Sequence, residues 1–512
     1  MPGLRLAAPG ALLAAEVFAV AAVTVYPAPE GAARAPDFHV TVEGKEVFVH
    51  NSAVAAYAHF SFSGKVRVRV SLEPGVVFPE SLHYSAWGMK FHPEPYRPPI
   101  ARLDVRPKRL GIKPVIEGDS FSFDLPEPAN LSIEINGNLL RPLFLFGAPP
   151  EENPPPPGGA KVRYFGPGKV HQAGRLEVGS GETVYIAGGA VVRGMIAVEN
   201  ARNVRIRGRG ILDGSDPADT PGPMIEMRNS RDVSVEGIVI LNDTGWTLVP
   251  RFSEDLRFDN IKMIAWGNNS DGVDICASKR VRIADSFLRN NDDCIPIKAA
   301  KEAAGDVEGV EVARCVLWNG LGGNAMEIGF ELQTDLVRDI VFRRCDIIHV
   351  ENGAAFSIHN GDRAVVRDVL FEDIWVEDAR SELADIYIGL SIYSADCPWE
   401  YHRMNPKRKP LPAELRAEKW GDHSGQWLLL PGEEGKRRGV NRGRIENVVF
   451  RDITVLGDWP LTSRIIGYDG EHAARDVSFE RLRVRGRAIR SAEEAGIVAR
   501  HAPGLRFGSG RR

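Results

Sequence analysis

Two short segments of the chain carry carboxylates at a repeated spacing. They read NNSDGVDICAS (268–278) and NNDDCIPIKAA (290–300). When Ile275 is aligned with Ile297, the offset is 22 residues, and Asp271 falls over Asp293 with Asp292 beside it. Neighbouring strands lie about 4.8 Å apart, so the three carboxylates would share a small volume, and at least one should have a raised pKa. A protonated carboxyl beside an ionised one is the pair that glycoside hydrolysis uses.

The alternative interpretation of these aspartates is structural. Ladders of asparagine and aspartate cap turns in repetitive β proteins, and an isolated Asp-Asp pair would fit that role. The stacking of one aspartate over a pair, inside a matching apolar register, favours the catalytic interpretation. Neighbouring residues of a regular strand point to opposite faces, so Asp292 and Asp293 can share a site only at a strand start or a bulge.

The elements that must position these residues form a repeat. From about residue 160, short strands recur, each followed by a polar kink and a second strand. Their first apolar positions lie 23 to 30 residues apart, with one gap of 79, and are Val204, Val233, Leu256, Val281, Val310, Ile340, Val369, Val448 and Val477. A repeat of this length that cannot bury its own apolar face stacks on its neighbours as a solenoid. The leucine/asparagine consensus of leucine-rich repeats and the period of helical repeats are both absent from the sequence.

The repeat predicts an all-β protein whose residues 161–490 form a right-handed parallel β-helix. Before it, residues 36–150 alternate apolar and polar positions between turn residues, which predicts a small antiparallel β-sandwich. Residues 151–160 are a proline-rich linker. Residues 380–444 are an insertion, and long insertions on such scaffolds usually build a wall of a binding cleft. Residues 491–512 are expected to be a C-terminal tail.

Residues 1–35 are a leader or a possible signal segment. An alanine-rich apolar stretch with one early arginine favours secretion over a cytoplasmic location, although Glu16 interrupts that stretch. No later segment is long and apolar enough to span a bilayer.

Composition excludes several classes of partner. With 64 basic and 68 acidic residues the net charge is −4, so neither nucleic acid nor membrane insertion is expected. The cysteines are odd in number and lack zinc spacing, so we expect small buried apolar side chains and no disulfide framework. We expect no cofactor and no metal. The cysteines are Cys276, Cys294, Cys315, Cys345 and Cys397.

Three motifs together resemble the family 28 glycoside hydrolases, the polygalacturonase group. They are GWTLVP (245–250), NSDGVD (269–274) and NNDDCIPIK (290–298), and the resemblance covers roughly residues 160–490. It implies hydrolysis with inversion of configuration. By position, Asp292 would be the general acid, and Asp271 with Asp293 would hold and deprotonate the water. The acid and base carboxyls of an inverting enzyme are expected about 6.5–9.5 Å apart.

The resemblance fails where the family binds the substrate carboxylate. Its Gly-His-Gly motif corresponds to GLGGNAMEIGFE (320–331), which has no histidine, with Asn324 or a glycine in its place. Its Arg-Ile-Lys triplet is replaced, so that Ser357 and His359 stand where arginine and lysine would be. Serine does not replace a bidentate arginine, which argues against a plain polyuronide.

Stacking the coils gives two further columns beside the aspartates. One is Asp274, Pro296, Glu327 and Ser357; the other is Cys276, Lys298, Gly329 and His359. Acids outnumber bases, which suits recognition of hydroxyl groups. The order of sandwich and β-helix also resembles family 49, the dextranase and isopullulanase group, whose members hydrolyse neutral α-glucans. The expected substrate-binding residues are Asn269, Asp274, Lys298, Asn324, Glu327 and His359.

A polysaccharide or oligosaccharide is therefore the expected partner. Two alternatives remain: a polysaccharide lyase on the same scaffold, and a carbohydrate-binding β-helix without catalysis. A lyase would need a strong base such as arginine or lysine near the aspartates, and the triplet that could supply it is missing.

Overall fold

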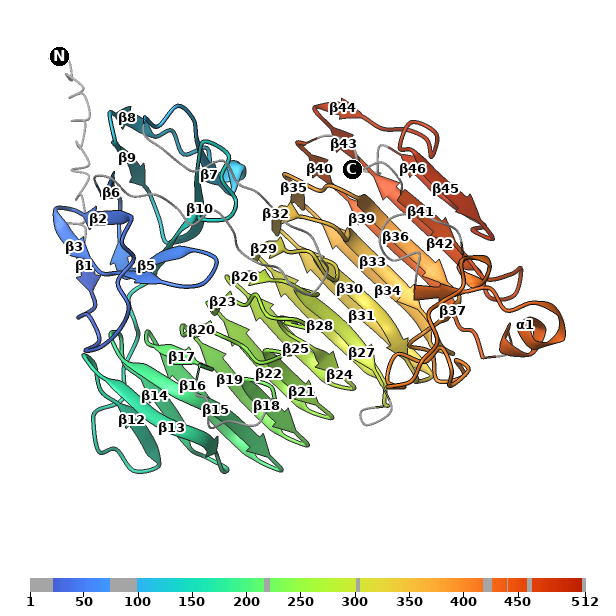
Figure 1. The fold of residues 1–512 in the computed structure, drawn as a ribbon, viewed down its shortest axis with the longest axis horizontal. Coiled ribbons are helices and arrows are strands. Elements are labelled where there is room, and N and C mark those ends of the chain that lie inside the picture. The colour runs from blue at the N-terminus through green and yellow to red at the C-terminus, as the bar shows by residue number, and fades with distance from the viewer. Residues whose placement is uncertain are drawn as a thin grey trace, which may run out of the picture.

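The computed structural model shows a β-sandwich joined to a long parallel β-helix (Figure 1). It describes residues 22–73, 99–215, 222–300, 304–417, 426–439, 441–457 and 463–508. The coils of the β-helix follow one another in chain order from the sandwich to the C-terminal end. Among the described residues, no helix has the length and apolar character needed to cross a membrane.

The sandwich consists of two sheets around an apolar core. Within the described part of the chain its strands pair antiparallel, except for β11 on β5. The first sheet contains β1 (Ala22–Val25), β4 (Val49–Asn51), β5 (Ala56–Ser63), β7 (Leu103–Arg106), β10 (Ala129–Ile135) and β11 (Leu143–Ala148). The second contains β2 (Phe38–Val42), β3 (Lys45–Val47), β6 (Val66–Leu72), β8 (Val115–Glu117) and β9 (Ser120–Leu125), and a 3-10 turn η1 covers Lys108–Leu110.

The sandwich begins earlier than the sequence predicted. Val23 of β1 pairs with Phe62 of β5, and this pairing satisfies backbone groups of residues assigned to the leader 1–35. Residues 1–21, the rest of that leader, lie outside the described residues. The proline-rich segment 151–160 contains no strand but is held to the β-helix, because the Tyr185 hydroxyl donates to Glu151 Oε2 at 2.8 Å.

One face of the β-helix is a twelve-stranded parallel sheet. The column of apolar residues from Val204 to Val477 pairs in the predicted order, including the step from Val369 to Val448 across the gap of 79 residues. The strands are β12 (Val162–Phe165), β14 (Thr183–Ile186), β16 (Arg202–Gly208), β19 (Arg231–Glu236), β22 (Glu254–Asp259), β25 (Lys279–Ala284), β28 (Val307–Ala313), β31 (Leu336–Arg343), β34 (Val365–Glu372), β39 (Arg444–Arg451), β42 (Ala474–Glu480) and β46 (Arg506–Gly508).

The other faces form a continuous 21-stranded sheet with two ladders. The sandwich ladder, named for what covers it, contains β17 (Ile211–Asp213), β20 (Val239–Leu241), β23 (Lys262–Ile264), β26 (Phe287–Asn290), β29 (Val316–Asn319), β32 (Asp346–Val350), β35 (Trp375–Val376), β40 (Thr454–Val455) and β43 (Arg483–Val484). The site ladder contains β18 (Ile225–Arg228), β21 (Leu248–Arg251), β24 (Ile275–Cys276), β27 (Ile295–Ala299), β30 (Met326–Leu332), β33 (Ala354–Asn360), β36 (Glu382–Ile388), β41 (Ser463–Ile466) and β45 (Ile497–Arg500). The sheet is completed by β13 (Val170–Glu177), β15 (Val191–Glu199) and β44 (Arg487–Ala488).

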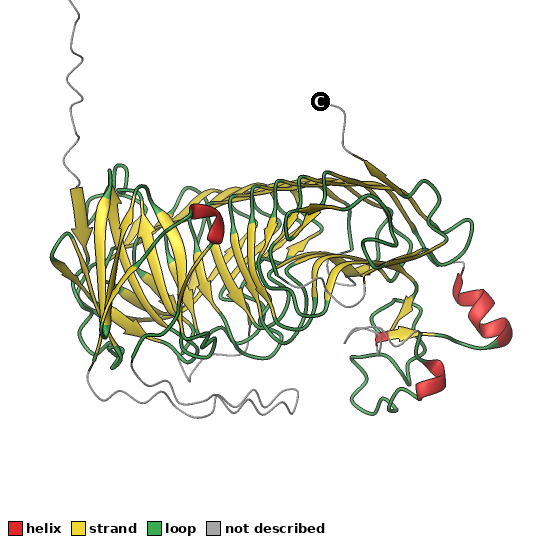
Figure 2. Cartoon of the chain, turned by 90° about the horizontal axis from the view of Figure 1, so that it is seen from above, coloured by secondary structure: helices red, strands yellow, loops and turns green. Residues whose placement is uncertain are grey.

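Two predicted boundaries of the β-helix are wrong. The insertion starts after β36 rather than at 380, because β36 pairs with β33 as a regular coil strand. The coils also continue through β45 and β46, so Ile497–Arg500 and Arg506–Gly508 pair with the preceding coil and this segment is not a tail. The insertion contains β37 (Leu390–Ser391), η3 (Ala413–Leu415), β38 (Trp427–Leu428) and α1 (Gly432–Gly439), and it projects from the side of the β-helix (Figure 2). All five cysteines are buried and free, as expected.

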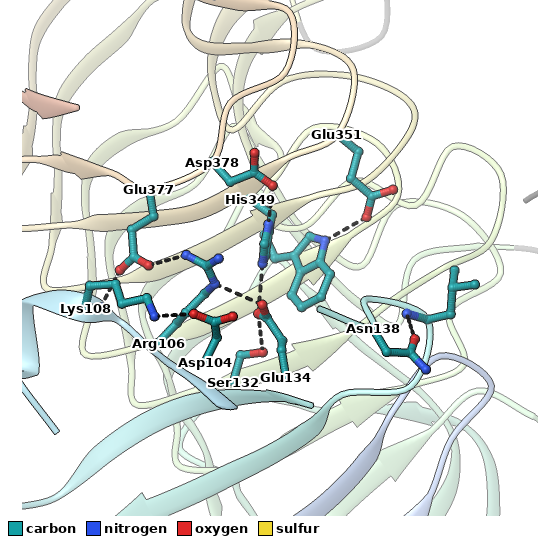
Figure 3. A network of polar contacts seen from close by, with 12 residues as sticks. Asp104, Arg106, Lys108, Ser132, Glu134, Asn138, His349, Glu351, Glu377 and Asp378 are labelled. Carbon is teal, nitrogen blue, oxygen red and sulfur yellow. Dashed lines mark hydrogen bonds and ion pairs between the residues drawn. The ribbon is translucent and has the colours of Figure 1, made fainter. Parts of the chain in front are cut away.

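The sandwich docks on the β-helix through a set of apolar side chains and, beside them, a network of buried polar side chains (Figure 3). Phe144 packs on Phe287 and Trp318 of the sandwich ladder. Beside them, Glu134 accepts from Arg106 at 3.0 Å and lies 2.8 Å from His349 Nε2. The other ring nitrogen of His349 lies 2.9 Å from Asp378, and Arg106 reaches Glu377 at 2.6 Å. Charges from both domains therefore complete one network.

The network favours the charged form of His349. Burial alone lowers the pKa of this imidazole, but the charge of Glu134 and the hydrogen bonds that the imidazole donates to Asp378 and Glu134 raise it above its usual value. Because His349 binds its proton more tightly in the folded than in the unfolded protein, protonation stabilises the folded state. This stabilisation is complete below the pKa of the unfolded state, about 6.5, and is lost as the pH rises through the pKa of the folded state.

Replacing His349 tests this docking. We expect His349→Asn to lower the free energy of unfolding by about 3 kcal/mol at pH 6, because Glu134 loses a buried charged partner. The deficit relative to the wild type should shrink as the pH rises above about 6.5, where the wild type loses the same proton. Chemical denaturation at pH 6 and at pH 9 measures both effects.

His472→Asn is the matched control. His472 pairs with Asp469 at 2.9 Å on the surface, where an ion pair contributes about 0–1 kcal/mol. A deficit of His349→Asn that grows with pH would contradict the account.

Candidate active site

The three aspartates meet where two coils of the site ladder begin. Ile275 pairs with Ile297, and Val273 N donates to Cys294 O at 3.0 Å, so the predicted offset of 22 residues is confirmed. Asp292 and Asp293 lie in the bend between β26 and β27. Because neither is in a regular strand, neighbouring side chains can point to the same site, which is the geometry that a shared site requires.

Amide and glycine residues from the next coil shape this bend. Asn319 Nδ2 donates to Asp292 O at 2.9 Å and to Gly322 O at 2.8 Å. Gly323 adopts φ +61°, and a Cβ atom there would lie 2.3 Å from Asp293 N and 2.5 Å from Asp292 Oδ1. Only glycine lets the backbone approach the aspartates so closely.

The carboxyls are closer together than an inverting pair was expected to be. One oxygen from each of Asp271, Asp292 and Asp293 lies within 4.8 Å of the others. Stacking on neighbouring coils fixes the distance between Asp271 and Asp293, and the bend brings Asp292 to them. Asp271 is 1% exposed and Asp293 8% exposed, whereas Asp292 is only partly buried. Asp292 is thus the most accessible of the three.

Lys298 supplies a positive charge among the carboxyls. Its Nζ lies 2.5 Å from Asp271 Oδ2, 3.0 Å from Asp274 Oδ1 and 3.9 Å from Asp293 Oδ2. The ammonium also lies 4.2 Å from the centre of the Trp246 ring, a cation–π contact. The three aspartates are a set that could ligate a cation, and the Lys298 ammonium already offsets part of their charge.

Burial raises the pKa of two members of the trio well above the ordinary range. For Asp271 the charge of Asp274 adds to burial, and for Asp293 the charges of Glu327 and Asp292 add to it. Burial likewise raises the pKa of Asp274 to about 6. The group can therefore hold a proton near neutral pH beside an ionised carboxylate.

A cavity of about 590 Å³ opens above the carboxyls. Its floor contains the three aspartates together with the predicted residues Asn269, Lys298 and Asn324. Its opposite wall comes from the insertion, as the sequence predicted. The insertion contributes Ile392, Tyr393, Tyr401, Arg403, Arg408, Lys409, Pro410, Leu411, Arg416 and Gln426.

Three of the predicted substrate-binding residues lie beneath the floor. Asp274, Glu327 and His359 are each 0% exposed, so they are not placed to contact a sugar. The prediction assumed that their columns face outward to solvent. Instead, Phe330 stacks on His359 with ring centres 4.3 Å apart, and Trp427 of the insertion packs on the same imidazole, so apolar rings cover this part of the ladder.

The positive charge on the cavity wall was not predicted from the sequence. Arg403 donates to Asn269 Oδ1 at 2.9 Å and lies over the Tyr393 ring at 5.1 Å. In the part of the chain that the structure describes, no carboxylate lies within ion-pair distance of Arg408, Lys409 or Arg416. The signal was the basic run RMNPKRKPLPAELR (403–416). This run lies in the insertion and outside the repeating coils, so the alignment of the coils did not place it at the site.

Comparison with known proteins agrees with this site. Residues 193–388 match the model of the Glycosyl hydrolases family 28. An exopolygalacturonase of Rhizopus delemar is 26% identical over 187 residues, 34% of this chain and 47% of that protein. An exopolygalacturonase of Arabidopsis thaliana is 23% identical over 201 residues, 36% of this chain and 46% of that protein. The matched regions thus span about half the length of these relatives.

The whole fold has a structural counterpart. Dex49A from Penicillium minioluteum superposes with a TM-score of 0.52 at 12% identity, covering 94% of this chain and 96% of its own. This likeness concerns the fold and includes the sandwich as well as the right-handed parallel β-helix. The region that carries the aspartates therefore resembles the family 28 glycosyl hydrolases in sequence, within an overall architecture like that of Dex49A.

Proposed function

We propose that the protein hydrolyses O-glycosidic bonds of a polysaccharide or oligosaccharide, with inversion of the anomeric configuration. The observation that carries this proposal is the stacked trio Asp271, Asp292 and Asp293 on the floor of a cavity with one lysine counter-ion, where burial raises the pKa of Asp271 and of Asp293. The match of residues 193–388 to family 28 supports the same reaction.

The three carboxyls have separate roles in this proposal. Asp292, the most accessible, protonates the leaving oxygen. Asp271 and Asp293 hold a water between them and accept its proton. Asp271 Oδ2 is engaged by Lys298, and Asp293 Oδ1 accepts two hydrogen bonds from Asn324. Two buried carboxyls that are fixed in this way are better placed to share a water than to attack the sugar directly, which favours inversion despite their short separation.

Removal of the acid should abolish turnover. We expect Asp292→Asn to lower kcat by about 10²–10⁴-fold, because an amide does not protonate the leaving oxygen. The release of reducing ends measures the loss, and thermal unfolding confirms that the variant is folded. Asp285→Asn is the control. Asp285 pairs with Arg314 on the surface, and its φ of +54° is one that asparagine also adopts, so this variant should fold and retain full activity.

Other outcomes of that assay would favour other functions. Product absorbance from unsaturated ends, abolished by a calcium chelator, would identify a lyase. Glycan binding without any shortening of the glycan, unaffected by Asp292→Asn, would identify a carbohydrate-binding β-helix.

We propose further that the sugar at the aspartates is not part of a plain polyuronide. Ser357 and His359, which replace the family's cations, are buried and hydrogen-bonded to Glu327, so they do not reach a substrate carboxylate. The cations Arg403, Arg408, Lys409 and Arg416 lie on the insertion wall instead. An acidic group of the glycan would be accommodated there and not at the floor.

A glycan panel tests the substrate proposal. We expect kcat/KM on polygalacturonate to be at least about tenfold below that on one of the other glycans, because one lost charged contact is worth more than about 1.4 kcal/mol. The panel contains polygalacturonate, other pectic backbones, dextran and pullulan. Polygalacturonate as the fastest substrate would overturn the argument from Ser357 and His359.

A further inference from the structure

A chain of polar side chains runs beneath the cavity floor from Asp293 across four further coils, those of β30, β33, β36 and β41. Asn324 N and Nδ2 donate to Asp293 Oδ1 at 2.7 and 3.3 Å, and Asn324 Nδ2 also donates to Glu327 Oε2 at 2.9 Å. Glu327 Oε1 lies 3.1 Å from His359 Nδ1, and His359 Nε2 lies 2.9 Å from Asp385 Oδ2. Arg464 then binds Asp385 through two contacts of 2.6 Å.

Every residue of this chain is fixed. Glu327, His359, Asp385 and Arg464 are 0% exposed, and Asn324 is 1% exposed. The side-chain Oδ1 of Asn324 accepts from Ala354 N at 2.9 Å. Because its oxygen is held by a backbone donor, its amide nitrogen must face both Glu327 and Asp293. Glu327 thereby orients the group that binds the catalytic carboxyl.

The charges along the chain alternate and balance. Burial alone lowers the pKa of His359, but Glu327 and Asp385 raise it to about 10, so the imidazole is charged at neutral pH. Burial would raise the pKa of Asp385, but Arg464 and His359 hold it well below its usual value. Burial and the nearby Asp385 raise the pKa of Glu382 to about 10, which keeps that side chain neutral. The carboxylates of Glu327 and Asp385 are thus matched by the cations of His359 and Arg464.

A buried array of charges adds little to stability, since apolar side chains of similar size often serve as well or better. At one end of this array, Asn324 contacts the carboxyl of Asp293. We propose that Asn324, Glu327 and His359 are positioning residues that orient the Asp293 carboxyl and set the pH range in which it accepts a proton. This inference rests on the proposed function of Asp293.

Other charged groups around Asp293 do not change between the variants that test this proposal. On the floor they are Asp271, Asp292 and Lys298. From the insertion, Tyr393 acts on Asp292 and Asp293, and Arg403 acts on Asp271 and Asp292. Glu331 of β30 lies on the cavity wall and acts on Arg403, Tyr393 and Lys298. The imidazole of His359 faces Glu327 and Asp385, with the uncharged rings of Phe330 and Trp427 packed against it.

The test is the acid limb of the kcat/KM–pH profile, where Asp293 must lose its proton to act as a base. Glu327→Gln removes a negative charge next to Asp293 and keeps an oxygen for Asn324. The pKa of Asp293 should fall, so the acid limb should move to lower pH by about one unit. His359→Asn leaves Glu327 uncompensated, so the limb should move up by a similar amount. The double variant removes both charges and should return the limb to near its wild-type position.

Ser357→Ala is the matched control. The Ser357 hydroxyl donates to Glu327 without carrying a charge, so its loss should leave the acid limb in place whatever it does to kcat. Shifts of the two single variants in the same direction, or no shift in either, would overturn the proposal, because a merely structural role predicts losses of kcat without opposite shifts.

The two proposals fail in different ways. A wild-type protein that cleaves no glycan would contradict the proposed function. An active wild type whose acid limb is unmoved in Glu327→Gln would contradict the positioning role alone. If His359→Asn does not fold, as judged by circular dichroism, the direction of the Glu327→Gln shift decides, since glutamine preserves the shape of the buried side chain.

Discussion

The register of hydrogen-bonded coils is the constraint on which the site depends. Parallel strands repeat about every 4.8 Å, and a regular pairing leaves no freedom to slide one coil along the next. The pairing of Ile275 with Ile297 therefore places Asp271 over Asp293. The pairings of later coils stack Glu327 on Ser357 and Ser357 on Asp385. A shift by one residue would turn every one of these side chains to the opposite face. The apolar core of the coils thus fixes the positions of groups that it does not touch.

Stacked carboxylates need compensating charge, and the structure provides it in two layers. Lys298 lies among the aspartates of the floor, within 2.5 Å of Asp271. Below the floor, His359 and Arg464 alternate with Glu327 and Asp385. The cations of the insertion wall face the cavity, and among the described residues no carboxylate lies within ion-pair distance of Arg408, Lys409 or Arg416. The floor is thus rich in carboxylates around one lysine, and the wall is rich in cations that face the cavity.

The β-helix, its register and the meeting of Asp271, Asp292 and Asp293 at one place could be predicted because they depend on local patterns that repeat. The column from Val204 to Val477 was found by spacing alone, and the coils pair in that order. Which columns remain open to solvent could not be predicted, since burial of His359 depends on Trp427, 68 residues away in an insertion without a repeat. For the same reason Arg403 and Arg408 were not predicted to face the cavity. The start of the sandwich was missed because β1 gains its partner β5 only in the folded protein.

The central claim is that three stacked carboxyls hydrolyse a glycosidic bond by placing one water between two of them. The anomer of the first product, followed by proton NMR before mutarotation, tests this most directly. Inversion is the result that a shared water predicts, although the carboxyl oxygens lie within 4.8 Å. A first product that retains the configuration of the substrate would show that Asp271 or Asp293 attacks the sugar as a nucleophile, and it would contradict the account.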